Sequence, residues 1–280
     1  MNNTAFDDYY YRIYGFRWEA LRKSLMENMP AYKFSGGLLT PYFLDYSSVL
    51  AARSLRLPAP DGKVQPESLD APVTVLDACA APGGKSLVIA SSLPPDAIIL
   101  ANELSAERRR RLSDVLDKHL PPGLRSQVKV CGFDAAAQAR RKSEHDRFDA
   151  ILLDAPCSSE AHVLKNERAL RGWTPARPRF LAQRQWALLS SAFLMLKQGG
   201  CLVYCTCAIS TVENDGVAQR LPEKYGSQVE LDPPDFTEGE QTQYGRLFLP
   251  DSAHCGPLYV ARFRKKNPFL SEYDRGACQS

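Results

Sequence analysis

Residues 73–86 read Val73-Thr74-Val75-Leu76-Asp77-Ala78-Cys79-Ala80-Ala81-Pro82-Gly83-Gly84-Lys85-Ser86. An apolar, β-branched run ends at Asp77, small residues follow, and the apolar segment 87–90 has the character of a helix beginning. Glycine in such a turn allows backbone N–H groups to approach a ligand, because it lacks the Cβ that would block them. The stretch therefore predicts a strand, a tight turn and a helix, with a ligand site beyond the end of the strand.

Two phosphate-binding patterns do not fit this turn. A P-loop requires a glycine five positions before Gly84, and that position holds Cys79. The pattern G-x-G-x-x-G is also missing, because Gly83 and Gly84 are adjacent. Twenty residues after Gly83, a second apolar run ends at Glu103, where a carboxylate would bind a ribose diol. A nucleoside ligand with little or no phosphate fits this site, and S-adenosylmethionine is such a ligand.

The composition is that of a soluble globular protein. The chain has 280 residues, of which 44% are hydrophobic and 24% are charged, enough for one α/β domain and a small appendage. The net charge is only +3, but basic residues cluster at 108–111, 140–142 and 262–266. One such run is usually a solvated surface, whereas three runs favour a polyanionic partner.

The sequence predicts a cytoplasmic protein that is not bound to a membrane. It contains no run of about 18 apolar residues, and its first 14 residues have no apolar core. The eight cysteines show no C-x2-C pattern, so free thiols are expected and no metal site is predicted. A monomer is expected.

Three regions differ in composition. Residues 1–57 interleave aromatic and basic side chains, which is typical both of an RNA-docking subdomain and of a small aromatic core. Residues 58–72 form a polar, proline-containing linker. Residues 73–280 alternate predicted strands and helices, including helices over 178–197 and 212–224. This alternation predicts an α/β fold with a mostly parallel, doubly wound sheet.

Polar residues follow the predicted strands where each strand ends: Asp77, Glu103, Asp134, Asp154 and Cys207. Because the carboxyl ends of parallel strands meet at one edge of a sheet, we expect these side chains to converge there.

Two loops place cysteines directly after buried strands: Asp154-Ala155-Pro156-Cys157-Ser158-Ser159 and Tyr204-Cys205-Thr206-Cys207-Ala208-Ile209-Ser210. Cysteine attacks as the thiolate. One methyl transfer requires such a thiol, because C5 of a pyrimidine attacks a sulfonium methyl only after a thiolate has added at C6. Asp154 is expected near N3 and the exocyclic amine, where an acidic residue would stabilise the adduct.

Three motifs, LDACAAPGGKS (76–86), DAPCSS (154–159) and YCTCAISTVEND (204–215), resemble those of the Nop/Sun, or RsmB-like, family of S-adenosylmethionine-dependent RNA (cytosine-5) methyltransferases. Segments 42–48 and 247–261 are also similar, so the resemblance extends over roughly residues 36–266. It implies a Rossmann-like class I methyltransferase domain that makes 5-methylcytosine in RNA. It also implies that Cys207 is the attacking thiol and that Cys157 helps to resolve the adduct.

The resemblance further assigns the cofactor site. The implied cofactor-binding residues are Cys79, Ala80, Ala81, Pro82, Gly83, Gly84, Lys85, Glu103, Arg108, Asp134 and Asp154. Residues 79–85 would surround the methionine end, Glu103 would bind the ribose, and Asp134 would lie near the adenine. Asp154 would lie between the cofactor and the base.

Three positions depart from the family pattern. Ser159 replaces a usual glycine, Ala208 replaces a usual serine, and Glu103 stands where aspartate is more common. None of these changes removes a reacting group, so activity on ribosomal RNA is expected, with transfer RNA as the alternative. A non-catalytic RNA-binding assembly factor with the same fold is the second alternative. A protein partner that supplies RNA specificity is compatible with either.

Overall fold

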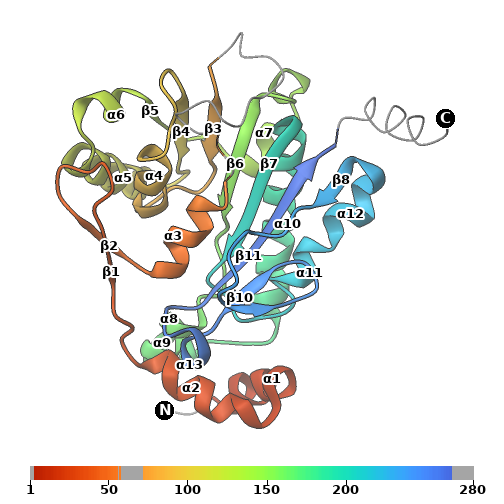
Figure 1. Ribbon diagram of the computed structural model, residues 1–280. Helices are drawn as coiled ribbons and strands as arrows, with labels where there is room; N and C mark the ends of the chain where they lie inside the picture. Colours follow the sequence, from red (N-terminus) through yellow and green to blue (C-terminus); the bar gives the residue numbers. More distant parts are fainter. Residues whose placement is uncertain (1–2, 56, 58–71, 267–280) are drawn as a thin grey trace, which may run out of the picture.

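The computed structural model describes residues 3–55, 57 and 72–266 and has one large sheet with helices on both faces (Figure 1). The predicted linker, 58–72, lies outside the described residues except for residue 72. Every helix in the described part of the chain is too short or too polar to cross a bilayer.

The large sheet has nine strands in the order β5-β4-β3-β6-β7-β11-β10-β9, and β8 pairs with β11. The strands are β3 (Thr74–Asp77), β4 (Ile98–Asn102), β5 (Val128–Cys131), β6 (Phe148–Asp154), β7 (Leu196–Thr206), β8 (Val229–Leu231), β9 (Glu240–Gln241), β10 (Arg246–Phe248) and β11 (Leu258–Lys265). In sheet order, the five neighbouring strands β5, β4, β3, β6 and β7 are parallel to one another. The strand β11 pairs antiparallel with β7, β8 and β10. The chain runs outward from β3 to β5 and then returns to place β6 on the other side of β3, so the topological switch point lies between β3 and β6. This is the predicted Rossmann-like fold.

Both faces of the sheet are buried, as in a doubly wound fold. Along β6, Ala150 and Leu152 join the apolar cluster beneath α3 (Tyr46–Arg53), α4 (Gly84–Ala90) and α5 (Ala106–His119). Ile151 and Leu153 join the cluster beneath α10 (Ala176–Met195) on the other face. The helices after β3 are α4 (Gly84–Ala90), α5 (Ala106–His119), α6 (Pro122–Ser126), α7 (Ala135–Gln138), η2 (Lys142–Glu144), α8 (Glu160–Lys165), α9 (Glu167–Arg171), α10 (Ala176–Met195), α11 (Asp215–Ala218), α12 (Arg220–Tyr225), η3 (Gly226–Gln228) and α13 (Pro250–Ala253).

The N-terminal region contributes to both apolar clusters, its first two helices to the cluster that includes α10 and residues 34–55 to the cluster that includes α4 and α5. Its elements are α1 (Thr4–Tyr14), η1 (Gly15–Arg17), α2 (Trp18–Met26), the antiparallel pair β1 (Tyr32–Phe34) and β2 (Tyr42–Leu44), and α3 (Tyr46–Arg53). Phe6, Tyr10 and Trp18 are buried core residues: Phe6 and Tyr10 pack against Trp173, and Trp18 stacks on Tyr10. Tyr11 and Phe16 stay exposed.

Two predicted helices have different bounds. The helix predicted over 212–224 is broken into α11 and α12, because Pro222 has no N–H to donate to Ala218 and its ring clashes with that carbonyl. The helix predicted over 178–197 ends at Met195, and the Gly199-Gly200 pair that follows lies inside β7. Gly199 has a φ of +77° there, beside a register irregularity in the pairing with β6.

Candidate active site

The glycine turn after β3 has the backbone that its sequence predicts. Gly83 has a φ of +119°, which side-chain-bearing residues rarely adopt. A Cβ at Gly84 would lie 2.9 Å from Cε1 of Tyr42, so glycine permits the Tyr42 ring to pack against the start of α4. At the end of β3, the buried Asp77 carboxylate accepts a hydrogen bond of 2.6 Å from Ser86 in α4. The turn is thus held between the strand and the helix.

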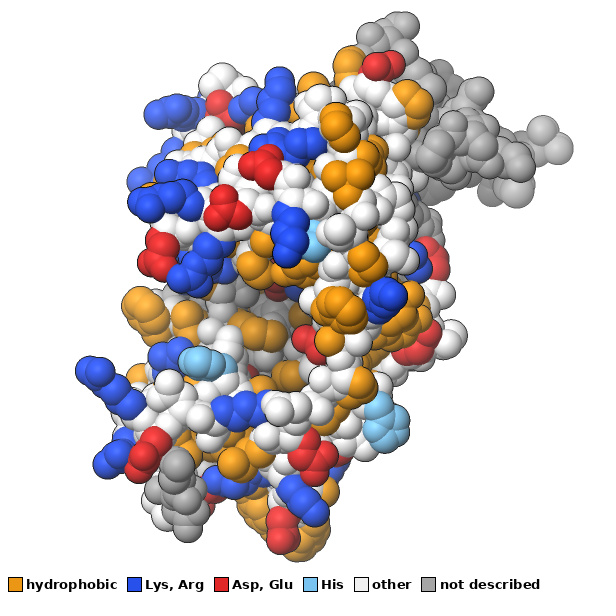
Figure 2. Space-filling view, turned by 90° about the vertical axis from the view of Figure 1, so that its left-hand side faces the viewer, with side chains coloured by type: hydrophobic (Ala, Val, Ile, Leu, Met, Phe, Trp, Pro, Cys, Tyr) orange, Lys and Arg blue, Asp and Glu red, His pale blue; other side chains and the backbone are white. Residues whose placement is uncertain are grey.

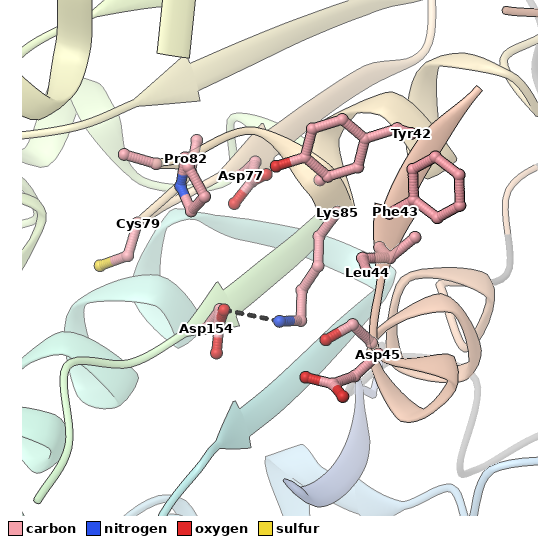
Figure 3. Close-up of a pocket in the computed structure, with 13 residues that line it drawn as sticks. Tyr42, Phe43, Leu44, Asp45, Asp77, Cys79, Pro82, Lys85 and Asp154 are labelled. Atoms are coloured by element: carbon pink, nitrogen blue, oxygen red, sulfur yellow. Dashed lines mark hydrogen bonds and ion pairs between the residues drawn. The ribbon is translucent and has the colours of Figure 1, made fainter. Parts of the chain in front are cut away.

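A cavity of about 290 Å³ lies against this turn (Figure 3). Its lining residues are Tyr42, Phe43, Leu44, Asp45, Ser48, Asp77, Cys79, Ala80, Ala81, Pro82, Gly84, Lys85 and Asp154. Six of the predicted cofactor residues in the turn thereby share one cavity with Asp154. The wall formed by 42–48 was not among the predicted cofactor residues, and it comes from β2 and the start of α3.

Lys85 and Asp154 form an ion pair inside the cavity. The Lys85 ammonium lies 2.7 Å from a carboxylate oxygen of Asp154, and Figure 3 shows it reaching from α4 toward the end of β6. Burial, reinforced by the nearby Asp154 charge, raises the pKa of Asp77 to about 7, although the Ser86 hydrogen bond opposes this. The other oxygen of Asp77 has no hydrogen-bond partner within the described residues. This oxygen is a buried acceptor beside the cavity.

Glu103 and Arg108 are brought together at the end of β4. Their side chains form an ion pair of 3.2 Å, and Arg108 also donates to the carbonyl of Ala81 in the turn, at 2.8 Å. The second oxygen of Glu103 accepts from the backbone N–H of Ser105. Arg108 therefore links the end of β4 to the glycine turn. Neither Glu103 nor Arg108 is among the residues that line the cavity.

Asn102 is a site residue that sequence reasoning missed. Its buried amide donates to the carbonyls of Ala78 and Phe133 at 3.0 and 3.1 Å and accepts from the N–H of Phe133. It thereby joins the loops that follow β3 and β5. An asparagine at the end of an apolar strand, directly before Glu103, is the signal that could have identified it.

Asp134 follows β5 and caps α7, as its carboxylate accepts from the N–H of Ala136. Arg184 of α10 donates to the same carboxylate at 2.6 Å and holds the pKa of Asp134 below its usual range. Like Gly83, Asp134 lies outside the lining of the cavity. The partner from α10 could not be read from the sequence, because 50 residues separate the two.

The two predicted cysteines lie together. The sulfur atoms of Cys157 and Cys207 are 2.8 Å apart, both thiols are free, and the Ser159 hydroxyl lies 3.1 Å from Cys207. Hydrogen bonds from Cys157 and Ser159 lower the pKa of Cys207, against the effect of burial. The same contact with Cys207, together with burial, raises the pKa of Cys157. The negative charge of the pair is thus favoured on Cys207.

Two buried carboxylates, neither singled out from the sequence, hold the cysteine loops. Glu213 accepts from the N–H of Ser158 at 2.9 Å and from the side chain of Gln185 at 2.8 Å. Glu160 accepts from the N–H of Ile209 at 3.0 Å, and the hydroxyl of Ser158 contacts both carboxylates. Burial and the nearby Glu160 raise the pKa of Glu213 to about 7.

Three tyrosines of α1 contact the same loops. Tyr10 donates to the carboxylate of Glu160, Tyr14 donates to the carbonyl of Ile209 at 2.6 Å, and the Tyr9 hydroxyl lies 3.1 Å from that of Ser210. The N-terminal helix therefore supports the two loops that carry Cys157 and Cys207, a role that the sequence prediction did not include.

Exposed basic side chains gather on α5 and around α9 and the start of α10: Arg108, Arg110, Arg111, Arg168, Arg171, Arg177 and Arg179. Figure 2 shows the face on the left-hand side of Figure 1, which is hollowed between regions that carry Lys and Arg side chains.

Comparison with known proteins identifies a family. The family model described as 16S rRNA methyltransferase RsmB/F matches residues 65–264. The chain is 39% identical over 204 residues to the ribosomal RNA small subunit methyltransferase F of Vibrio parahaemolyticus, and 39% identical over 201 residues to that of Escherichia coli O157:H7. These matches cover 71% and 70% of this chain but 41% of each relative, so the chain spans about two fifths of their length.

Two solved structures from Pyrococcus horikoshii have the same fold. One is NSun6 with SFG, an S-adenosylmethionine analogue, at 27% identity and a TM-score of 0.65, covering 84% of this chain and 55% of that chain. The other is described as a methyltransferase homolog, at 22% identity and a TM-score of 0.70, covering 94% and 95% of the two chains.

Proposed function

The chain belongs to the RsmB/F family of 16S rRNA methyltransferases, and from this premise we propose that it transfers a methyl group from S-adenosylmethionine to C5 of a cytosine in ribosomal RNA. The observation that carries the proposal is the pair of thiols of Cys157 and Cys207, 2.8 Å apart, beyond the ends of β6 and β7. Asp154, at the end of β6, also lines the cavity beside the glycine turn that follows β3.

The residues around the cavity suit S-adenosylmethionine, which supplies a methyl group activated by a sulfonium. The unpartnered, buried oxygen of Asp77 would accept from the amino group of its methionine end. Residues 79–85 would surround that end, and the Glu103 carboxylate would bind the ribose hydroxyls. Asp134 would lie on the adenine side, held in place by Arg184.

The thiols have separate roles in the proposed reaction. The thiolate of Cys207 would add to C6 of the cytosine, and the electron pair of the C5–C6 double bond would move to C5. C5 would then attack the methyl group, whose bond to the sulfonium sulfur breaks, and S-adenosylhomocysteine would leave. A base would then take the C5 proton, the C5–H electron pair would restore the double bond, and the S–C6 bond would break with its pair returning to the Cys207 sulfur. Cys157 would assist this resolution. Asp154, fixed by Lys85, would contact N3 and the exocyclic amine.

The reaction requires the target base to leave any helical stack, because Cys207 is half-buried and must approach C6 from one side of the ring. The arginines of α5 and of the α9–α10 segment would contact phosphates beside the hollow seen in Figure 2. The segment 1–57 would contribute its exposed aromatic and basic side chains to RNA docking.

Trapping of the covalent adduct tests this proposal. The Cys157→Ala variant would be mixed with S-adenosylmethionine and an unmodified 16S rRNA transcript, with a tRNA transcript in parallel, and analysed on a denaturing gel. We expect a protein–RNA adduct with 16S rRNA that disappears in Cys157→Ala/Cys207→Ala.

Other outcomes would replace the proposal in defined ways. An adduct formed by Cys207→Ala instead would reverse the roles of the two thiols. An adduct with tRNA alone would change the substrate class. RNA binding and cofactor binding without methyl transfer would identify a non-catalytic assembly factor.

A further inference from the structure

Ser159 occupies a backbone conformation that favours glycine. Its φ is +53° and its ψ is +59°, in the left-handed region that few non-glycine residues adopt. Glycine would adopt this conformation without strain. Serine adds a Cβ and a hydroxyl at this point, so its side chain is the feature that requires an explanation.

The hydroxyl of Ser159 faces the two thiols. It lies 3.1 Å from the sulfur of Cys207 and 3.5 Å from that of Cys157. The carbonyl of Ser159 accepts from the N–H groups of His162 and Val163 at 2.9 and 3.0 Å, which fixes the residue at the start of α8. The hydroxyl is thus presented to Cys207 by a backbone that the helix holds in place.

We propose that Ser159 is a further catalytic residue, whose hydroxyl donates a hydrogen bond to the sulfur of Cys207 both when that thiolate attacks and when it leaves. The inference rests on the proposed function. On attack the S–C6 bond forms, and on departure that bond breaks and its electron pair returns to sulfur. The hydroxyl keeps its proton throughout and stabilises the sulfur anion at both ends of the reaction.

The surroundings of Cys207 explain why a second donor matters. Hydrogen bonds, first from Cys157 and then from Ser159, lower the pKa of Cys207, whereas burial and the carboxylates of Asp154 and Glu160 raise it. Lys85 is the cation that interacts with this thiol from α4. While Cys157 assists the resolution of the adduct, its thiol no longer donates to Cys207. Ser159 still provides a donor to the leaving sulfur.

Alkylation of Cys207 tests the contact without RNA. Ser159→Ala and Ser159→Gly would be made in a Cys157→Ala background, where Cys207 titrates without a coupled thiol. The rate of iodoacetamide modification at Cys207 would be followed against pH by peptide mass spectrometry. We expect both substitutions to raise the apparent pKa of Cys207 by about one, because each removes one hydrogen bond to a charged group.

The two substitutions separate the hydroxyl from the backbone. Alanine keeps the Cβ that is strained in the left-handed conformation, whereas glycine removes the Cβ and its strain. Both variants lack the hydroxyl. An unchanged pKa in both variants, or a change in only one of them, would overturn the proposal.

Methyl transfer to the 16S rRNA transcript, measured with Cys157 intact, tests the catalytic role. Single-turnover rates at pH 7 should fall about tenfold in both Ser159 variants and recover in part as the pH rises through the new pKa of Cys207. A fall that is the same at every pH would contradict a hydrogen-bonding role. No methyl transfer by the unaltered protein, together with the expected shift in alkylation, would overturn the proposed function and leave the contact with Cys207 established.

Discussion

The ammonium nitrogen of Lys85 lies 2.7 Å from the carboxylate of Asp154, across the point between β3 and β6 where the strand order reverses. Lys85 follows the glycine turn and Asp154 precedes the loop that carries Cys157, so this ion pair joins the proposed cofactor side of the site to the proposed catalytic side. A parallel sheet with a switch point brings two such loops together because their strands are neighbours.

Replacing Lys85 by methionine should weaken both the fold and cofactor binding. Asp154 would lose its ionic partner in a partly buried cavity, which should lower the free energy of unfolding by about 1–3 kcal/mol. Affinity for S-adenosylmethionine, measured by calorimetry, should fall about tenfold, equivalent to about 1.4 kcal/mol.

Lys197→Met is the matched control for that variant. Lys197 pairs with Asp149 at the opposite end of β6, and both side chains are about one third exposed. Its loss should cost less than about 1 kcal/mol and leave cofactor affinity unchanged. Equal losses of affinity in the two variants would show that the Lys85 pair has no special role at the cavity.

Gly84→Ala should reduce cofactor affinity by steric displacement. The new Cβ would lie 2.9 Å from the Tyr42 ring and 3.3 Å from a methyl carbon of Leu44, both of which line the cavity. Overpacking of this kind typically costs about 1–3 kcal/mol. Calorimetric titration with S-adenosylmethionine and thermal unfolding would measure the two effects.

Gly123→Ala provides the comparison, because a Cβ there meets no atom within 4 Å and the residue lies in α6. It should be neutral or stabilise the helix by up to about 1 kcal/mol. Unchanged cofactor affinity in Gly84→Ala would mean that the Tyr42 ring moves without affecting the cavity.

Tyr10→Phe should destabilise the protein far more than Tyr11→Phe. Tyr10 is fully buried and donates to the buried carboxylate of Glu160, which would lose a partner at a cost of about 1–3 kcal/mol. Tyr11 is adjacent in the same helix and 47% exposed, so its hydroxyl should contribute less than about 0.5 kcal/mol. Urea unfolding of both variants measures the difference, and similar values would contradict the role of α1 in holding the loops that carry Cys157 and Cys207.

The stability of the protein should fall as the pH rises from about 4.5 to about 7. Burial raises the pKa of Glu213 to about 7 from an ordinary value of 4.5, so the folded state retains a proton that the unfolded state has lost. Because the folded state binds more protons in this window, the free energy of unfolding decreases with pH and becomes level above it. Asp77, with its pKa also raised to about 7, contributes with the same sign.

Glu213→Gln isolates one of these two contributions, since glutamine resembles the neutral carboxyl group. The stability of the unaltered protein relative to this variant should decline between pH 4.5 and 7 by up to about 3 kcal/mol, at about 1.4 kcal/mol per pKa unit. Urea unfolding at a series of pH values measures this difference. A difference that is constant with pH would show that Glu213 is already ionised in the folded protein.

The sequence alone determined the strand, turn and helix around Gly83 and the convergence of Asp77, Glu103, Asp134 and Asp154 at strand ends. These features depend on local pattern and on one general rule, because the carboxyl ends of parallel strands meet at one edge of a sheet. The motif resemblance added the family, which the comparisons confirm. The residue roles at the site remain predictions.

Only the tertiary structure decided which groups support that edge. It placed Tyr42 against Gly84, Arg184 on Asp134, and the tyrosines of α1 on the cysteine loops. These partners are 42 to 201 residues apart in the chain, and no periodic pattern in the sequence encodes a contact at such separations. The geometry that favours charge on Cys207 over Cys157 also arises only when two loops, each following its own strand, are brought within hydrogen-bonding distance.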